Sequence, residues 1–318
     1  MIVVLAASSV GLLGLPCLLR RLARRLPPAE WAQLSVVLLV FGGVTFETAL
    51  VLAGAPTVLR ALGVPALADL CQRMLGDLVP GGSVVGWWAA GSAVAIPLIA
   101  GRGALRAVRT HRCLHVESLL GRHEQLGEHE LVVLPSDQPF AFSLPATTRR
   151  SRAQVVVSER LVDELPPAEL EAVLRHEVAH IEEHHPGYLI VIIMLEHGLV
   201  LLPFLRRSTA ALRGALERWA DERAAGASPG GRATVRAALL RITDAMVAPG
   251  VTAFTSSADT VLERVQAMEE VAGPRRAWPQ RWLVYVPALL LGVATIVSLG
   301  LWLDEAHFVL ATMGVCPV

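Results

Sequence analysis

Two histidines spaced four residues apart form the part of this 318-residue sequence that is best suited to chemistry. His176, Glu177 and His180 make up an H-E-x-x-H pattern. On a helix, residues i and i+4 share a face, so both imidazoles can reach one tetrahedral metal ion. Glu177 directly follows the first histidine and is placed to take a proton from water at that ion. The pattern therefore predicts a catalytic zinc site, with one Zn²⁺ per chain.

A catalytic zinc site needs a third protein ligand and one open position. A third histidine directly downstream is excluded, because Glu183 and Pro186 stand where that arrangement needs glycine and histidine. We therefore expect the third ligand to be Glu217, in a segment of strong helix character, with Glu222 as the competing candidate. Asp221 lies one helical turn after Glu217, where its carboxylate can accept the spare N–H of a ligand histidine. The alternative is a solvated, charged helix face that binds no metal.

Two further histidines, His184 and His185, follow the H-E-x-x-H pattern. Either side chain could help to stabilise an oxyanion. Capping of the carbonyl end of the preceding helix is the favoured interpretation, because cationic side chains interact well with that end.

The composition indicates a membrane protein, since 53% of the residues are apolar, only 18% are charged and the mean hydropathy is +0.52. A formal net charge of zero argues against direct binding of nucleic acid. Four segments are long and apolar enough to cross about 30 Å of hydrocarbon. They are, approximately, 2–19, 34–54, 84–101 and 283–303. The first could instead be a signal peptide, but its basic residues follow the apolar stretch and do not precede it.

The arginines set the expected orientation, because cytoplasmic flanks are enriched in basic residues. All 28 basic residues are arginine, which indicates a GC-rich, bacterial gene. They cluster after the first and third segments and before the fourth. We therefore predict a multi-pass plasma-membrane protein with both termini outside the cell. Cys71 and Cys316 would then both lie outside, either as a disulfide or as two free thiols.

The predicted organisation has three parts, and the predicted fold class is α+β and mostly helical. The parts are a membrane region with three transmembrane helices (1–112), a cytoplasmic zinc metalloprotease domain (113–281), and a fourth transmembrane helix with a short tail outside (282–318). In the middle part, short strands are expected at 131–134, 140–144 and 154–157, before a helix from Pro166 to about His185. The apolar stretch 188–205 cannot cross the bilayer, because His180 and Glu217 would then lie on opposite sides. We interpret it as a buried helix or as one at the membrane interface.

This combination of residues resembles the gluzincin metallopeptidases. It is most similar to the BlaR/MecR-type membrane antirepressor family and, more distantly, to the HtpX/Ste24-type membrane proteases. The similar blocks are 141–145, 155–158, 169–180, 217–221 and 262–265. The resemblance implies zinc bound by His176, His180 and Glu217, with Glu177 as the catalytic residue. Antibiotic-sensing relatives carry a large penicillin-binding domain after the last span, whereas only a short segment follows it here, so β-lactam sensing is not expected.

Together these observations predict an integral-membrane zinc endopeptidase that cleaves a cytoplasmic or membrane-proximal protein. The resemblance implies a transcriptional repressor of the BlaI/MecI kind as one substrate class. Two alternatives are a quality-control protease of the HtpX/Ste24 kind and a non-catalytic signalling receptor with a structural zinc site. Residues 154–157 are expected to form an edge strand that binds an extended substrate. The other expected partner is the lipid bilayer, and a homodimer is a further alternative.

Overall fold

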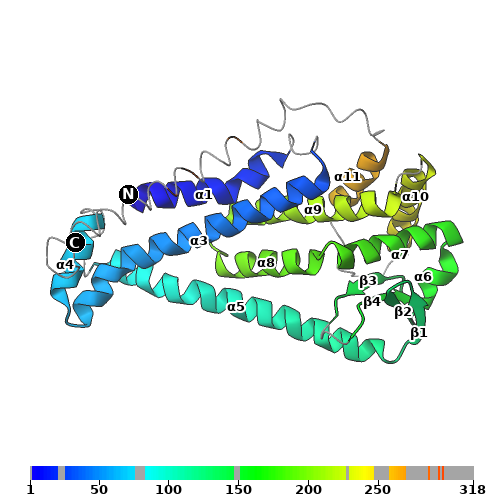
Figure 1. The fold of residues 1–318 in the computed structure, drawn as a ribbon, viewed down its shortest axis with the longest axis horizontal. Helices are drawn as coiled ribbons and strands as arrows, with labels where there is room; N and C mark the ends of the chain where they lie inside the picture. The colour runs from blue at the N-terminus through cyan, green and yellow to red at the C-terminus, as the bar shows by residue number, and fades with distance from the viewer. Residues whose placement is uncertain are drawn as a thin grey trace.

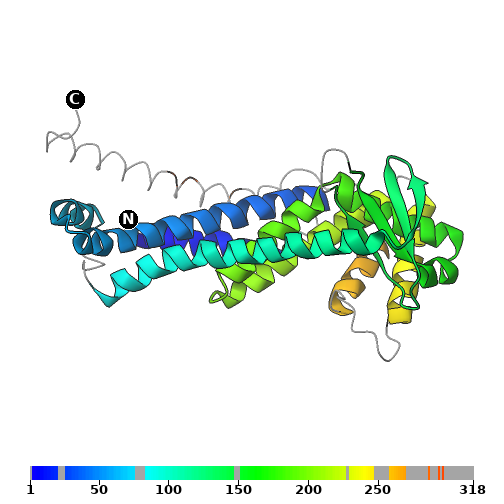
Figure 2. The ribbon, with the colours of Figure 1, turned by 90° about the horizontal axis from the view of Figure 1, so that it is seen from below.

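Helices make up most of the protein, and one small sheet lies at one end of it (Figures 1 and 2). The computed structural model describes residues 2–20, 26–75, 83–146, 151–226, 229–246 and 258–269, with isolated positions 286, 293 and 296. The helices are α1 (Ile2–Leu18), α3 (Pro28–Ala61), α4 (Pro65–Leu75), α5 (Val84–Ser118), α6 (Glu159–Glu164), α7 (Pro167–Glu182), α8 (His185–Gly198), α9 (Pro203–Ala225), α10 (Pro229–Met246) and α11 (Ala258–Glu269). The strands are β1 (Arg122–Leu126), β2 (His129–Leu134), β3 (Ala141–Leu144) and β4 (Gln154–Ser158). The predicted mostly helical α+β composition is confirmed.

Two of the described helices, α3 and α5, are long and apolar enough to cross a bilayer. They contain the second and third predicted spans. The first predicted span corresponds to α1, an apolar helix of 17 residues that is shorter than the other two. The fourth, at about 283–303, lies outside the described residues except for three isolated helical positions. Length and composition therefore support two spans, and a total of four stays a prediction.

The two long helices approach each other closely at a glycine. A Cβ built on Gly54 of α3 would lie 2.7 Å from the backbone N and Cα of Ala90 on α5. Any larger residue would push the helices apart, so a small residue is needed at this crossing. The helix α5 then continues past the end of its predicted span and reaches the sheet (Figure 2). Residues on both sides of the predicted 112/113 boundary thus belong to one continuous helix.

The four strands are ordered β1-β2-β4-β3 in the sheet. β1 and β2 form an antiparallel hairpin, β2 and β4 run parallel, and β3 and β4 run antiparallel. Val156 at the centre of β4 pairs with Val132 on one side and with Phe142 on the other. The prediction that 154–157 forms an edge strand is therefore wrong. β3 occupies the edge, because pairing with the distant β2 places β4 inside the sheet.

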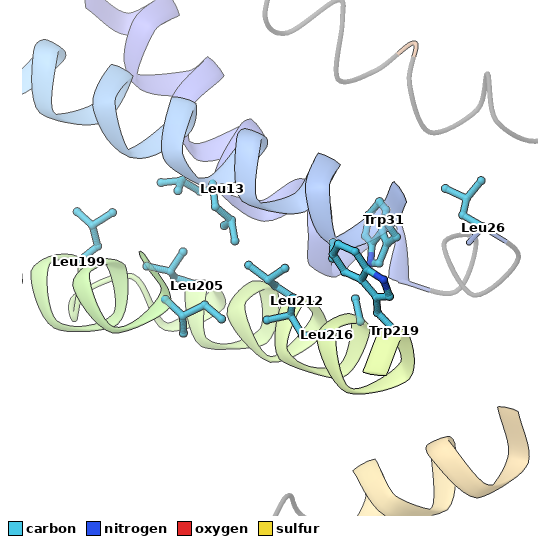
Figure 3. Packing of buried hydrophobic residues seen from close by; sticks show 12 residues of the cluster. Leu13, Leu26, Trp31, Leu199, Leu205, Leu212, Leu216 and Trp219 are labelled. Atoms are coloured by element: carbon cyan, nitrogen blue, oxygen red, sulfur yellow. The ribbon is translucent and has the colours of Figure 1, made fainter. Parts of the chain in front are cut away.

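The apolar stretch 188–205 belongs to two helices, α8 and the start of α9, which are joined by a short turn. These helices pack against α1, α3 and α5. The shared core contains Leu13 of α1 and Trp31 of α3, which lie beside Leu212 and Trp219 of α9 (Figure 3). This core holds α9, which carries Glu217, against the long helices.

Candidate metal centre

The H-E-x-x-H residues lie on α7, which begins with Pro167 in its first turn, where a missing N–H costs nothing. Ala172 and Val173 face the core and orient the helix, so that His176 and His180 both face α9. The helix ends at Glu182, earlier than the predicted end near His185. The reason is His184, whose backbone turns into the left-handed region with φ 57° and redirects the chain into α8.

The structure brings His176, His180 and Glu217 together. The Nε2 atoms of the two histidines are 3.1 Å apart. Glu217 Oε2 lies 3.6 Å from His176 Nε2, and Glu217 Oε1 lies 3.7 Å from His180 Nε2. Bonds of about 2.0–2.2 Å to one tetrahedral zinc would place its ligand atoms about 3.3–3.6 Å apart. Among the described residues, this group of metal-binding atoms includes Glu217 and not the competing Glu222.

A buried ion-pair network lies behind these three residues. Asp221 has no exposed surface, and its Oδ1 lies 3.0 Å from His176 Nδ1. Arg264 of α11 donates from Nη2 and Nε to the two oxygens of Asp221, at 2.7 and 2.8 Å. Its Nη1 lies 3.0 Å from Glu217 Oε2. One guanidinium therefore holds both carboxylates of α9 in place.

The network determines which groups are charged in the metal-free protein. Burial lowers the pKa of His176, but hydrogen bonds to Asp221 and Glu217 outweigh burial and raise this pKa to about 10. Burial raises the pKa of Glu217 and of Asp221, yet the charge of Arg264 brings both well below their ordinary values. Burial, with the nearby His176, lowers the pKa of His180 to about 4. At neutral pH, His176 is thus protonated, both acids are ionised and His180 is neutral.

Glu177 lies next to the ligand group and beside the edge strand β3. Burial raises the pKa of its carboxyl group, and a hydrogen bond with the Ser143 side chain of β3 partly opposes that rise. A carboxyl group with a raised pKa can take a proton from water and later return it near neutral pH. This environment suits a general acid and base.

His185 is completely buried, and its Nδ1 lies 2.8 Å from Nδ1 of His180. If His180 binds metal through Nε2, its Nδ1 carries the proton and donates a hydrogen bond to Nδ1 of His185. This tautomer of His180 is assigned from the contact between the two rings. The ring of His185 also packs against Trp219, with 4.9 Å between ring centroids. The interpretation of His185 as a helix cap is therefore wrong, because the residue begins α8 and faces His180 instead.

Sequence reasoning assigned no role to Arg264 and Ser143, which contact the candidate site. Arg264 lies 43 residues after Asp221 in the sequence, and no local pattern links the two. The block 262–265, noted above for its family resemblance, was the available signal for this arginine.

Residues 111–245 match the model of peptidase family M48. The comparisons with curated proteins and with solved structures gave no match. The matched segment contains α7 and α9, and with them His176, Glu177, His180, Glu217 and Asp221. Residues 111–245 are therefore similar to peptidase family M48, the metallopeptidase family that includes BlaR-, HtpX- and Ste24-type proteases.

Proposed function

We propose that this protein is an integral-membrane, zinc-dependent endopeptidase. His176, His180 and Glu217 are the proposed metal ligands, and Glu177 is the proposed catalytic residue. The observation that supports this most is the convergence of the three ligand side chains from α7 and α9. Two imidazoles and one carboxylate are a ligand set that zinc prefers, and they leave a fourth position for catalysis.

The reaction is hydrolysis of a peptide bond. Bound Zn²⁺ supplies a Lewis acid that polarises the scissile carbonyl and makes water more acidic. Glu177 accepts the proton of the attacking water and then donates it to the leaving amine. Asp221 keeps the His176 ring in position through Nδ1, and His185 does the same for His180.

The edge strand β3 is the proposed binding site for an extended substrate. The N–H of Ser158 donates a hydrogen bond to the carbonyl of Phe140. Along an antiparallel pair, only every second residue of a strand forms backbone hydrogen bonds with the partner strand. The backbone groups of Ala141 and Ser143 accordingly face away from β4. A substrate that pairs with them as an added strand passes Glu177, because the Ser143 side chain contacts that carboxyl group.

The proposed substrate is a cytoplasmic or membrane-proximal protein. A transcriptional repressor of the BlaI/MecI kind is one candidate, supported by the resemblance of the sequence to BlaR/MecR-type proteins. Degradation of damaged membrane proteins is the second candidate, supported by the match to a family that includes HtpX- and Ste24-type proteases. Proteins that accumulate in cells with an inactive Glu177 variant would distinguish the two.

Replacing Glu177 with glutamine tests the proposed reaction. The variant keeps the shape of the side chain but cannot accept a proton, so we expect casein cleavage to fall by at least about 100-fold. Zinc content, measured by elemental analysis, is expected to remain at one ion per chain. Glu171→Gln, an exposed change on the same helix, is the control and is expected to keep full activity.

Equal activity of the wild type and Glu177→Gln would refute the proposed role of Glu177. Zinc binding by a wild-type protein that cleaves neither casein nor a repressor would favour the non-catalytic receptor.

A further inference from the structure

The turn between α8 and α9 carries an apolar tip, defined as residues 199–204. Within it, Leu201 is 78% exposed and Val200 is 55% exposed. Surface turns are usually polar, because water must solvate their backbone. Adjacent exposed apolar side chains at a turn indicate contact with a partner or a membrane. The tip lies at the end of α8 that is farther from the metal centre (Figure 1).

The tip and the last turn of α8 that leads to it lie alongside all three N-terminal predicted spans. A Cβ built on Gly198 would lie 3.2 Å from the Ala100 Cβ on α5. One built on Gly14 of α1 would lie 3.8 Å from the Phe204 ring, and one on Gly43 of α3 would lie 3.0 Å from a methyl group of Leu195.

These contacts lie inside the proposed hydrocarbon layer. Gly14 is about five residues from the predicted cytoplasmic end of its span, which corresponds to about 7 Å at 1.5 Å per residue. The side chain of Ile96, which also lies beside Gly198, is about as far from the end of the third span. The tip therefore reaches below the level at which the proposed cytoplasmic headgroups begin.

A shallow insertion requires that charged residues near the tip either reach the headgroups or are paired with an opposite charge, and both conditions are met. Arg206 and Arg207 are exposed in the first turns of α9, where their long side chains can extend to the headgroups. The negative charge of Glu196 is balanced by a neighbouring arginine. Glu196 accepts a hydrogen bond from Thr209 at 2.6 Å, and its other oxygen lies 3.0 Å from Nη2 of Arg213. An apolar tip followed by arginines is the order in which a helix leaves the hydrocarbon for a cytoplasmic surface.

We propose that the apolar tip inserts into the hydrocarbon of the cytoplasmic leaflet, with Arg206 and Arg207 among its anionic headgroups. The inserted segment is a hairpin that enters and leaves on the same side. This inference rests on the proposed membrane orientation of α3 and α5, which also carry exposed apolar side chains. Neither the tip nor the hairpin needs to cross the bilayer, so His180 and Glu217 stay on one side.

The insertion narrows the class of substrate. The 14 residues of α8 connect the tip to His185, which contacts His180, and they span about 21 Å. With a tip about 7 Å deep, the metal centre lies within roughly 15 Å of the membrane surface. The enzyme is thus suited to peptide bonds in juxtamembrane segments, which a bilayer-bound substrate holds at this height.

Spin labels test the insertion without reference to proteolysis. Leu201→Cys is labelled with a nitroxide in a protein whose native cysteines are replaced, in vesicles of phosphatidylcholine and phosphatidylglycerol. The matched control is Leu120→Cys at the sheet end of α5, where the leucine is 81% exposed. We expect the label at 201 to collide mainly with oxygen, and the label at 120 mainly with a water-soluble nickel chelate. The ratio of the two collision rates should differ at least fivefold between the sites.

Two further labels make the outcomes distinguishable. Val94→Cys, on the exposed face of α5, reports whether that helix lies in lipid, and Val200→Cys repeats the tip measurement if the first variant fails to fold. If the label at 94 collides mainly with oxygen (a lipid signal) and the label at 201 mainly with the nickel chelate (a water signal), the proposed insertion is overturned. The proposed membrane protease would not be affected by this result. Water signals at both would refute the membrane orientation as well. Protection of 201 from both reagents would show that protein covers the tip, and this result would also overturn the proposal.

Discussion

The two proposed ligand histidines, His176 and His180, differ in charge because only His176 has a direct contact with Asp221. In the metal-free protein, hydrogen bonds to Asp221 and Glu217 overcome burial and raise the pKa of His176 to about 10. Burial lowers the pKa of His180 to about 4, and the charge of His176 adds to this effect. A metal ion needs the lone pair on both Nε2 atoms. It must therefore displace a proton from His176 and none from His180.

Proton release on zinc binding should follow from this difference. At pH 8 in the Glu177→Gln background, which removes one nearby titrating group, we expect release of about one proton per ion. Because His176 is protonated below its pKa of about 10, apparent affinity should rise about tenfold per pH unit toward that value. Calorimetry in buffers of different ionisation enthalpy measures the release.

The control for proton release is Asp221→Asn. Without the carboxylate, the pKa of His176 should fall toward its ordinary value, so fewer protons are bound at pH 8 and fewer are released. Equal release by both proteins would mean that Asp221 does not set the charge of His176.

The short helix α11 is held to the rest of the domain by ion pairs. Arg264 binds Asp221 and Glu217 of α9 inside the protein. At the surface, Glu263 pairs with Arg20 after α1 at 2.5 Å, and Glu269 pairs with Arg236 of α10 at 2.9 Å. Exposed pairs contribute little stability, so the buried contacts of Arg264 are expected to matter most.

Replacing Arg264 with methionine should loosen α11. The change leaves two carboxylates without their buried cation, which typically costs about 3–5 kcal/mol of stability. We expect faster amide hydrogen exchange across residues 258–269 and a lower melting temperature of the metal-free protein. Hydrogen-exchange mass spectrometry measures the first effect, and a thermal scan the second.

The matched control for α11 is Arg236→Gln, which removes an exposed ion pair to the same helix. Its expected cost is below about 1 kcal/mol. If the two variants exchange at the same rate as the wild type, Arg264 does not hold α11 in place.

At the scale of the whole molecule, α5 joins the apolar helices to the sheet beside the metal centre (Figure 2). Near its end, His115 Nε2 lies 2.9 Å from the carbonyl of Pro145, just after β3. Ser118 donates to the side chain of Gln154 on β4 at 2.9 Å. These polar contacts attach the sheet, including its edge strand, to the helix that we propose crosses the membrane.

The proposed orientation places α4 outside the cell and the sheet end of α5 in the cytoplasm. Cysteines introduced at these two places should therefore react with a labelling reagent from opposite sides of the membrane. Leu67→Cys on α4 should react with an impermeant maleimide in intact cells, because α4 follows the proposed outer end of α3. Leu120→Cys, which follows α5 beside the sheet, should react only after the membrane is permeabilised. Both variants carry no other cysteine. The reverse pattern would invert the proposed topology.

The sequence by itself predicted the parts of the site that depend on local geometry. The H-E-x-x-H residues lie on one face of α7 because helical spacing alone places i and i+4 together. The expected helix for Glu217 and the strands near 131, 141 and 154 were also predictable, since propensity and alternation act over a few residues. The mostly helical fold followed from the same local patterns.

Tertiary structure alone decided the features that join distant segments. It selected Glu217 over Glu222 for the ligand group, since only packing of α9 against α7 determines which acid faces the histidines. It placed β4 inside the sheet, because strand order depends on pairing with the distant β2. It also brought Arg264 to Asp221 and His185 to His180. Such contacts arise from packing between elements, which the periodicity of any single segment does not encode.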